Sequence, residues 1–195
     1  MRNIIIFVLL TASVTLTKAQ QISYFCQGGA AKNLQIAACT GGTAPYTYKW
    51  TSPTAVVTNS NSITINNISQ AGVWTWECRD AGGCTAIGSH EVIFEPTPVF
   101  NINAINICLN ASLIVTAVGV PSGYTYSWNF GSGAVPATSI TPSTSVLWNT
   151  IGSKTITLTI EKIFDGTACD ATCSWVQTTT ITVGSGNITG TSSCN

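Results

Sequence analysis

Alternation of apolar and polar residues runs through much of the chain and predicts β-strands. In residues 46–50 the even positions are aromatic and the odd positions are polar, so one face of this strand is buried and the other is solvated. Trp74, Trp76 and Cys78 share one face of a later strand in the same way. No stretch shows sustained helical periodicity. The pattern predicts an all-β chain.

The same pattern occurs twice. Tyr-Thr-Tyr-Lys-Trp at 46–50 returns as Tyr-Thr-Tyr-Ser-Trp at 124–128. A cysteine precedes each copy (Cys26 and Cys108), and an alternating strand that starts with glycine follows each copy. Features that recur at a spacing of about 80 residues indicate similar small domains, and this period suits a β-sandwich of seven or eight strands.

The repeat predicts two tandem immunoglobulin-like β-sandwich domains, residues 22–95 and 99–184, joined by a stiff Pro-Thr-Pro segment. Residues 1–19 have the short positive start and apolar stretch of a cleaved signal peptide. That stretch is too short to span a bilayer, so we expect no membrane insertion of the mature chain. Residues 185–195 are expected to be a linker or the start of a further repeat.

Charge is scarce. Charged residues make up 7% of the chain, and seven Lys and Arg balance seven Asp and Glu. Without a basic stripe there is no electrostatic basis for binding nucleic acid. Apolar residues are still plentiful and alternate with Thr, Ser and Asn, which excludes a disordered chain. A hydroxyl-rich surface of this kind predicts a secreted or cell-surface protein.

Eight cysteines in an exported chain indicate disulfides rather than metal ligands. The closest pair, Cys169 and Cys173, lacks the spacing of a zinc site, and the single histidine, His90, lies in the other half. We therefore expect no metal and no cofactor.

The spacing of the cysteines suggests a pairing in the first half. Cys39 precedes Trp50 by eleven residues and Cys78 ends a later strand, which is the arrangement of the disulfide and its tryptophan pin in immunoglobulin-like sandwiches. We therefore pair Cys39 with Cys78, which leaves Cys26 for Cys84.

In the second half Trp128 is the corresponding core pin. Cys108 takes the place of Cys26, and Cys173 lies as far before the end of its strand as Cys84 does, so we pair Cys108 with Cys173. Two accounts of Cys194 stay open. It either opens a further repeat or closes a bridge to Cys169.

Four motifs stand out in the first half: Gly-Gly-Thr-Ala-Pro-Tyr-Thr-Tyr-Lys-Trp at 41–50, Ile-Asn-Asn-Ile at 65–68, Ala-Gly-Val-Trp at 71–74 and Asp-Ala-Gly-Gly-Cys-Thr at 80–85. With these motifs the first half resembles the SprB-type repeats of gliding-motility and surface adhesins in Bacteroidota. The Cys39 and Cys78 pair departs from that pattern, since such repeats usually carry ordinary core residues there.

The second half carries Cys108, Tyr-Ser-Trp-Asn-Phe-Gly-Ser-Gly at 126–133, Gly-Ser-Lys-Thr-Ile-Thr-Leu at 152–158 and Thr-Ile-Thr-Val at 180–183. With these motifs it is similar to a PKD-like (polycystic kidney disease-like) β-sandwich domain. Ser132-Gly133-Ala134 replaces the usual acidic loop, which removes a carboxylate calcium site. Together the two resemblances imply an extracellular spacer or adhesion module that binds a surface protein or glycan.

Catalytic residues are not expected. His90 is the one histidine base, a Ser-His-Asp site would need Asp80 or a more distant acid, and no nucleophile elbow occurs. We interpret His90, beside Glu91 on the last strand of the first half, as a solvated edge residue. Glycoside hydrolysis needs two facing carboxylates. The available pairs are Glu91 with Glu95 on one strand and Asp165 with Asp170 in one loop, and we interpret both as solvated acids.

Tryptophan offers the main alternative function. Exposed aromatic rings on a sandwich can stack on sugars, and this hypothesis makes the chain a carbohydrate-binding accessory module of a secreted protein. However, Trp50, Trp74, Trp76 and Trp128 fall on faces predicted to be buried. Trp148 and Trp175 are the two tryptophans left for sugar stacking, and Trp148 shares its parity with apolar Val146, which favours the core.

Overall fold

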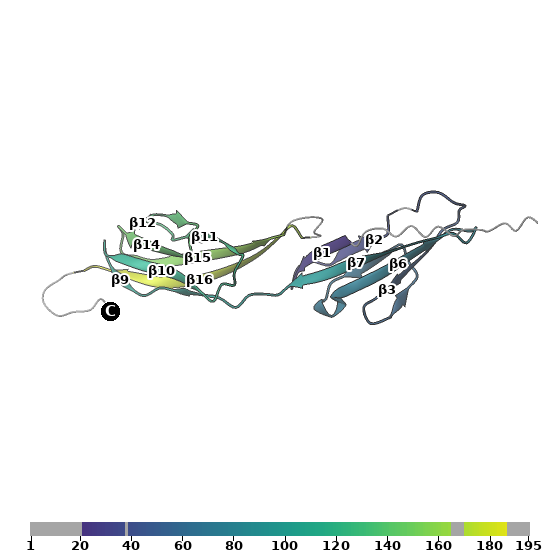
Figure 1. Cartoon of the computed structure of the whole chain (residues 1–195). Helices are drawn as coiled ribbons and strands as arrows, with labels where there is room; N and C mark the ends of the chain where they lie inside the picture. The colour runs from purple at the N-terminus through teal and green to yellow at the C-terminus, as the bar shows by residue number, and fades with distance from the viewer. Residues whose placement is uncertain (1–20, 38, 165–169, 187–195) are drawn as a thin grey trace, which may run out of the picture. The chain divides into compact units, whose positions relative to one another are not determined.

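The computed structural model describes residues 21–37, 39–164 and 170–186 (Figure 1). The predicted signal peptide, Asp165, Cys169 and Cys194 lie outside these residues. Contacts divide the chain into two compact units. The described part of the first unit is residues 21–23 with Gly28–Phe94, and the second unit combines Tyr24–Gln27 with the chain from Glu95 onward. No sequence signal assigned Tyr24–Gln27 to the second unit.

The first unit contains a five-stranded sheet in the order β1-β7-β6-β3-β4 and a two-stranded sheet of β2 and β5. A short 3-10 helix, η1 (Ile68–Gln70), precedes β6. The strands are β1 (Gln21–Cys26), β2 (Lys32–Gln35), β3 (Thr47–Thr51), β4 (Val57–Thr58), β5 (Ser62–Ile65), β6 (Gly72–Arg79) and β7 (Thr85–Glu95).

Trp50 lies at the centre of the first core. It is 1% exposed and packs edge-on against Trp74, with 6.5 Å between the ring centroids. Trp76 of β6 is the register partner of Trp50 on β3 and of Gly88 on β7. The indole ring of Trp76 covers Gly88, so that a Cβ at position 88 would collide with the ring. Leu34 of β2 is also buried. The aromatic face predicted from alternation is therefore the inner face of the sheet.

The second unit has a four-stranded sheet in the order β12-β14-β10-β8 and a five-stranded sheet in the order β13-β11-β15-β16-β9. The strands are β8 (Asn101–Asn103), β9 (Ile107–Cys108), β10 (Ser112–Val118), β11 (Thr125–Asn129), β12 (Ala134–Val135), β13 (Thr138–Ser139), β14 (Ser143–Trp148), β15 (Gly152–Ile163) and β16 (Thr172–Gly184).

The two five-stranded sheets explain the internal repeat. Read from β1 and from β9, the orders β1-β7-β6-β3-β4 and β9-β16-β15-β11-β13 correspond strand for strand. Gly72 pairs with Val92 and Gly152 pairs with Val183, so each glycine opens a central strand opposite the end of the last strand. Both units are immunoglobulin-like β-sandwiches, and the predicted all-β fold class is confirmed.

Trp128 is the counterpart of Trp50 in the second core and is also 1% exposed. Its ring stacks on Phe130 with 5.6 Å between centroids, and Leu158 lies beside it on β15. Trp148 of the opposite sheet is fully buried, and its indole N–H donates to the carbonyl of Phe130 at 3.0 Å. Trp50 differs, because its buried indole N–H has no hydrogen-bond partner among the described residues.

This contrast predicts unequal costs for the same substitution. Trp148→Phe leaves the buried carbonyl of Phe130 without its donor, whereas Trp50→Phe removes an N–H that is already unpaired. We expect Trp148→Phe to lower the free energy of unfolding by about 1–3 kcal/mol more than Trp50→Phe does. Guanidinium denaturation followed by NMR signals of each unit measures both values. Equal costs, or a larger cost at Trp50, would contradict this account of the two cores.

Candidate binding surface

The structure contains a disulfide between Cys39 and Cys78, with 6.6 Å between their Cα atoms. This is the pairing that the spacing around Trp50 predicts. Cys78 is buried at the end of β6, while Cys39 follows the end of β2 at Gln35. The bridge therefore connects the strand that carries the aromatic face to the segment that leaves the smaller sheet.

The second bridge differs from both remaining predictions. Cys26 pairs with Cys173, with 5.5 Å between Cα atoms, rather than with Cys84. Cys84 is an exposed free thiol. Because Cys173 is taken by Cys26, the predicted bridge between Cys108 and Cys173 is also wrong, although Cys108 is itself disulfide-bonded.

Local contacts explain the bridge between Cys26 and Cys173. The Asp170 N–H donates to the Tyr24 carbonyl at 3.0 Å, and the Cys26 N–H donates to the Asp170 carboxylate at 3.1 Å. The Tyr24 ring stacks on Phe164 with 4.4 Å between centroids. The prediction paired cysteines within each half of the sequence, whereas residues 24–27 fold with the second half.

None of the aromatic side chains in the described residues is exposed. Trp148 is fully buried, and Trp175 is half-buried against Tyr124 with 5.7 Å between ring centroids. The described part of the chain therefore offers no pair of exposed rings of the kind that stacks on a sugar.

His90 is not the solvated edge residue that we predicted. It lies opposite Trp74 on β7, and its Nε2 is 2.6 Å from the hydroxyl of buried Ser23. Burial lowers the pKa of His90 below its ordinary value of 6.5. Its parity with buried Val92 was the sequence signal for this inward position.

Asp80 organises a turn rather than a catalytic site. Its carboxylate accepts the Thr43 N–H at 2.9 Å and the Cys84 N–H at 2.7 Å. The Thr43 N–H, followed by other backbone donors, holds the pKa of Asp80 below its ordinary value. Gly42 has a φ of +84°, and a Cβ there would collide with the Asp80 carboxylate. Asp80 thus joins the β6–β7 turn to the loop before β3.

Glu91 and Glu95 do not form a facing pair of acids. Glu91 lies opposite Val73 in the first unit, whereas Glu95 belongs to the second unit and accepts the Tyr124 hydroxyl at 2.6 Å. Burial, followed by the hydrogen bond to Glu95, raises the pKa of Tyr124. Within the described residues no three His, Cys, Asp or Glu side chains gather as metal ligands. Of the acid pair Asp165 and Asp170, only Asp170 is described.

A groove of about 230 Å³ lies in the first unit between the β3–β4 turn and η1. Its lining includes Ser52, Thr54 and the edge of Trp74, and no charged side chain. Such a lining can hydrogen-bond a ligand but carries no group for acid–base chemistry.

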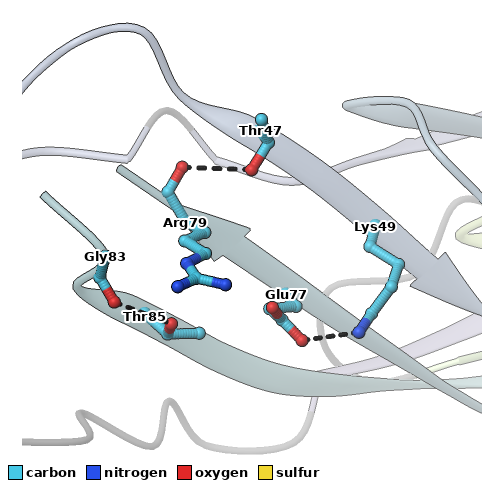
Figure 2. Close-up of polar contacts among 6 residues, drawn as sticks. All are labelled: Thr47, Lys49, Glu77, Arg79, Gly83 and Thr85. Atoms are coloured by element: carbon cyan, nitrogen blue, oxygen red, sulfur yellow. Dashed lines mark hydrogen bonds and ion pairs between the residues drawn. The ribbon is translucent and has the colours of Figure 1, made fainter. Parts of the chain in front are cut away.

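Charged side chains gather on the outer face of β3, β6 and β7. We call this surface the charged face and define it by Lys49, Glu77, Arg79 and Glu91. Lys49 and Glu77 are register partners, and their Nζ and Oε2 atoms are 2.6 Å apart (Figure 2). Next to them Arg79 pairs with Thr47 on one side and Thr85 on the other.

The polar contacts of the charged face hold its edges in place. Thr47 donates its hydroxyl to the carbonyl of Arg79 at 3.3 Å, and Thr85 donates its hydroxyl to the carbonyl of Gly83 at 3.5 Å (Figure 2). The Arg79 guanidinium extends over the same face (Figure 2). The result is a sheet surface that carries charges of both signs.

Comparison with known proteins bears only on the fold. No protein-family model and no curated protein matches the chain. Among solved structures, the chain is similar to four immunoglobulin domains of Sidekick-1 (13% identity, TM-score 0.42, 85% of this chain and 47% of that one). It is also similar to eight immunoglobulin domains of Down Syndrome Cell Adhesion Molecule (13% identity, TM-score 0.47, 87% of this chain and 23% of that one). A third similar structure is murine CEACAM1b (11% identity, TM-score 0.38, 85% of this chain and 94% of that one).

The chain spans less than half the length of the first two of these structures. At such identities the likeness concerns the fold alone, and the fold assignment stands on the strand order. Within the described residues no helix has the length and hydropathy needed to cross a membrane.

The position of His90 predicts a pH dependence of stability. Its pKa is lower in the folded than in the unfolded chain, so the unfolded chain binds the proton more readily as the pH falls below 6.5. Stability is therefore full above this pH and declines as the pH drops towards the folded pKa. We expect thermal melts of His90→Gln between about pH 8 and 5 to lack this decline, because carboxylates titrate lower. Parallel curves for both proteins would refute the assignment.

Asp80 gives a second test. Asp80→Ala removes the acceptor for two backbone donors, so we expect amide hydrogen exchange at Thr43 and Cys84 to accelerate by about tenfold or more. The amide of Ala81, which donates to the Thr43 carbonyl at 2.8 Å, serves as the internal reference for the turn. Unchanged protection at Thr43 and Cys84 would show that the carboxylate does not hold the loop.

Proposed function

We propose that this chain is a non-catalytic structural or adhesion module, secreted or held at the cell surface, that contacts another surface protein through the charged face. Its two sandwich units supply the rigid scaffold, and its disulfides suit an oxidising compartment. The motifs quoted above support a finer assignment, with an SprB-type repeat in the first unit and a PKD-like domain in the second.

The observation that carries this proposal is the distribution of charge. Eleven charged residues lie in the described part of the chain, and four of them, Lys49, Glu77, Arg79 and Glu91, lie on one face of one sheet. The side chains of Lys49 and Glu77 remain 43% and 32% exposed. In a hydroxyl-rich chain, this face is the place where electrostatic complementarity can select a partner.

A contribution to folding stability does not explain why charged residues lie on the charged face. An ion pair as exposed as Lys49 and Glu77 contributes about 0–1 kcal/mol to folding. Charges of both signs in fixed register instead steer association and exclude wrong partners. The tryptophans cannot serve as the contact, because all six lie in the described residues and are buried or half-buried.

Binding of the fluorescently labelled mature protein to cells of the organism that carries the gene tests this function. We expect saturable binding that protease treatment of the cells abolishes. Glu77→Lys places two lysines opposite each other and should weaken binding by about tenfold or more. Glu161→Lys is the matched control, since it makes the same charge change on the second unit and should leave binding unchanged.

A charge swap separates recognition from stability. The double variant Lys49→Glu with Glu77→Lys keeps an ion pair but reverses its direction on the face. We expect wild-type stability together with lost binding. Equal binding by the wild type, Glu77→Lys and the swap would contradict a role for the charged face. Binding that survives protease but is lost after periodate oxidation of cell-surface glycans would favour the carbohydrate-binding alternative.

A further inference from the structure

β16 is a long strand with one open edge. It contains 13 residues and pairs with β15 along twelve of them, from Thr172 to Val183 (Figure 1). Its other edge pairs with β9 through Val183 and Gly184 alone among the described strands. In the other five-stranded sheet, the corresponding strand β7 lies next to β1, which contains six residues. Much of the edge position beside β16 is therefore open, whereas β1 occupies the corresponding position beside β7.

Hydrogen bonds identify the residues that face this edge. The Thr182 N–H donates to the Asn106 side chain at 2.8 Å, and the Gly184 carbonyl accepts the Leu109 N–H at 2.9 Å. Both partners lie on the side away from β15. Backbone groups alternate between the two edges of an antiparallel strand. The N–H and C=O groups of the even-numbered residues of β16 therefore point away from β15, and we call these the outward residues. Four of these residues lie between the covered ends of the strand: Ser174, Val176, Thr178 and Thr180.

Both ends of the edge are covered. At the start, the Cys26 sulfur lies 3.7 Å from the Thr172 carbonyl oxygen, and Cys26 forms a disulfide with the adjacent Cys173. At the end, Asn106 and β9 occupy the outward groups. None of the described strands pairs with the outward groups of the four central residues.

The open edge lacks the features that usually prevent strand pairing. Proteins protect such edges with charged side chains, proline or bulges. β16 contains no Lys, Arg, Asp, Glu or Pro and pairs with β15 without interruption. The side chains of its four outward residues are exposed, and Val176 is 59% exposed. Threonine and valine also favour strands.

We propose that β16 pairs antiparallel with β16 of a second copy of this chain. A two-fold axis at Gln177 places Val176 opposite the partner's Thr178 and Ser174 opposite the partner's Thr180. The four outward residues of each copy then exchange N–H and C=O groups pairwise, which joins the two five-stranded sheets through eight hydrogen bonds. A second copy is the fitting occupant, because two uncharged strands meet without like-charge repulsion and pair hydroxyls with hydroxyls.

Thr178→Pro tests the proposal on the oxidised mature protein. Its N–H points away from β15, so proline removes an intermolecular donor without breaking the β15 ladder. Thr178→Lys is the second variant, because it brings two lysines together diagonally across the axis and protects the edge even if proline perturbs folding. Thr157→Lys is the matched control. Thr157 lies opposite Thr178 on β15, on the same face but away from the edge.

Sedimentation velocity over a wide range of protein concentration supplies the readout. We expect a monomer–dimer equilibrium whose Kd rises by at least about tenfold in Thr178→Pro and Thr178→Lys and stays unchanged in Thr157→Lys. The amides of Val176 and Thr178 should exchange more slowly as the concentration rises. A wild-type protein that stays monomeric, or Thr178 variants that dimerise as tightly as the wild type, would overturn the proposal.

Discussion

Burial of one tryptophan between two sheets is the constraint on which each unit depends. Trp50 lies on β3 and Trp128 on β11, which occupy the same position in the two five-stranded sheets. Once these indoles point inward, the period of two along a strand directs every second neighbour outward. The inner faces then hold most of the buried apolar side chains, and the outer faces hold much of the threonine and serine together with the charged face. Core and binding surfaces are therefore two results of the same alternation.

The alternation of apolar and polar residues predicts most of the strands and their inward faces, because it is a local property of each strand. It predicts the inward face of residues 46–50, and the structure buries Trp50 there. The same alternation places His90 on the inward face with Val92, two positions along the strand, although a polar side chain is expected to face solvent. The bridge between Cys26 and Cys173 was beyond such reasoning. It joins residues 147 positions apart and depends on Tyr24–Gln27 folding with the second unit, which no local pattern encodes.

The proposed role in recognition is consistent with the chemistry of the described residues. The one histidine is half-buried beside Ser23, and Asp80 is occupied by backbone donors. The two proposed contact surfaces are the charged face in the first unit and the uncharged edge of β16 in the second. These surfaces suit different partners, since charge selects a complementary surface whereas an unprotected edge selects another strand. A chain with both can contact a foreign surface and its own copies independently.

Indole hydrogen exchange in ¹⁵N-labelled protein tests most directly whether tryptophan burial defines the two cores. The indole N–H groups of Trp50, Trp128 and Trp148 should exchange far more slowly than those of the half-buried Trp76 and Trp175. Trp50 is the decisive signal, because its N–H has no hydrogen-bond partner among the described residues and burial alone must protect it. Slow exchange at Trp50 and Trp128 is the predicted result. Exchange of both at the rate of free tryptophan would contradict the account.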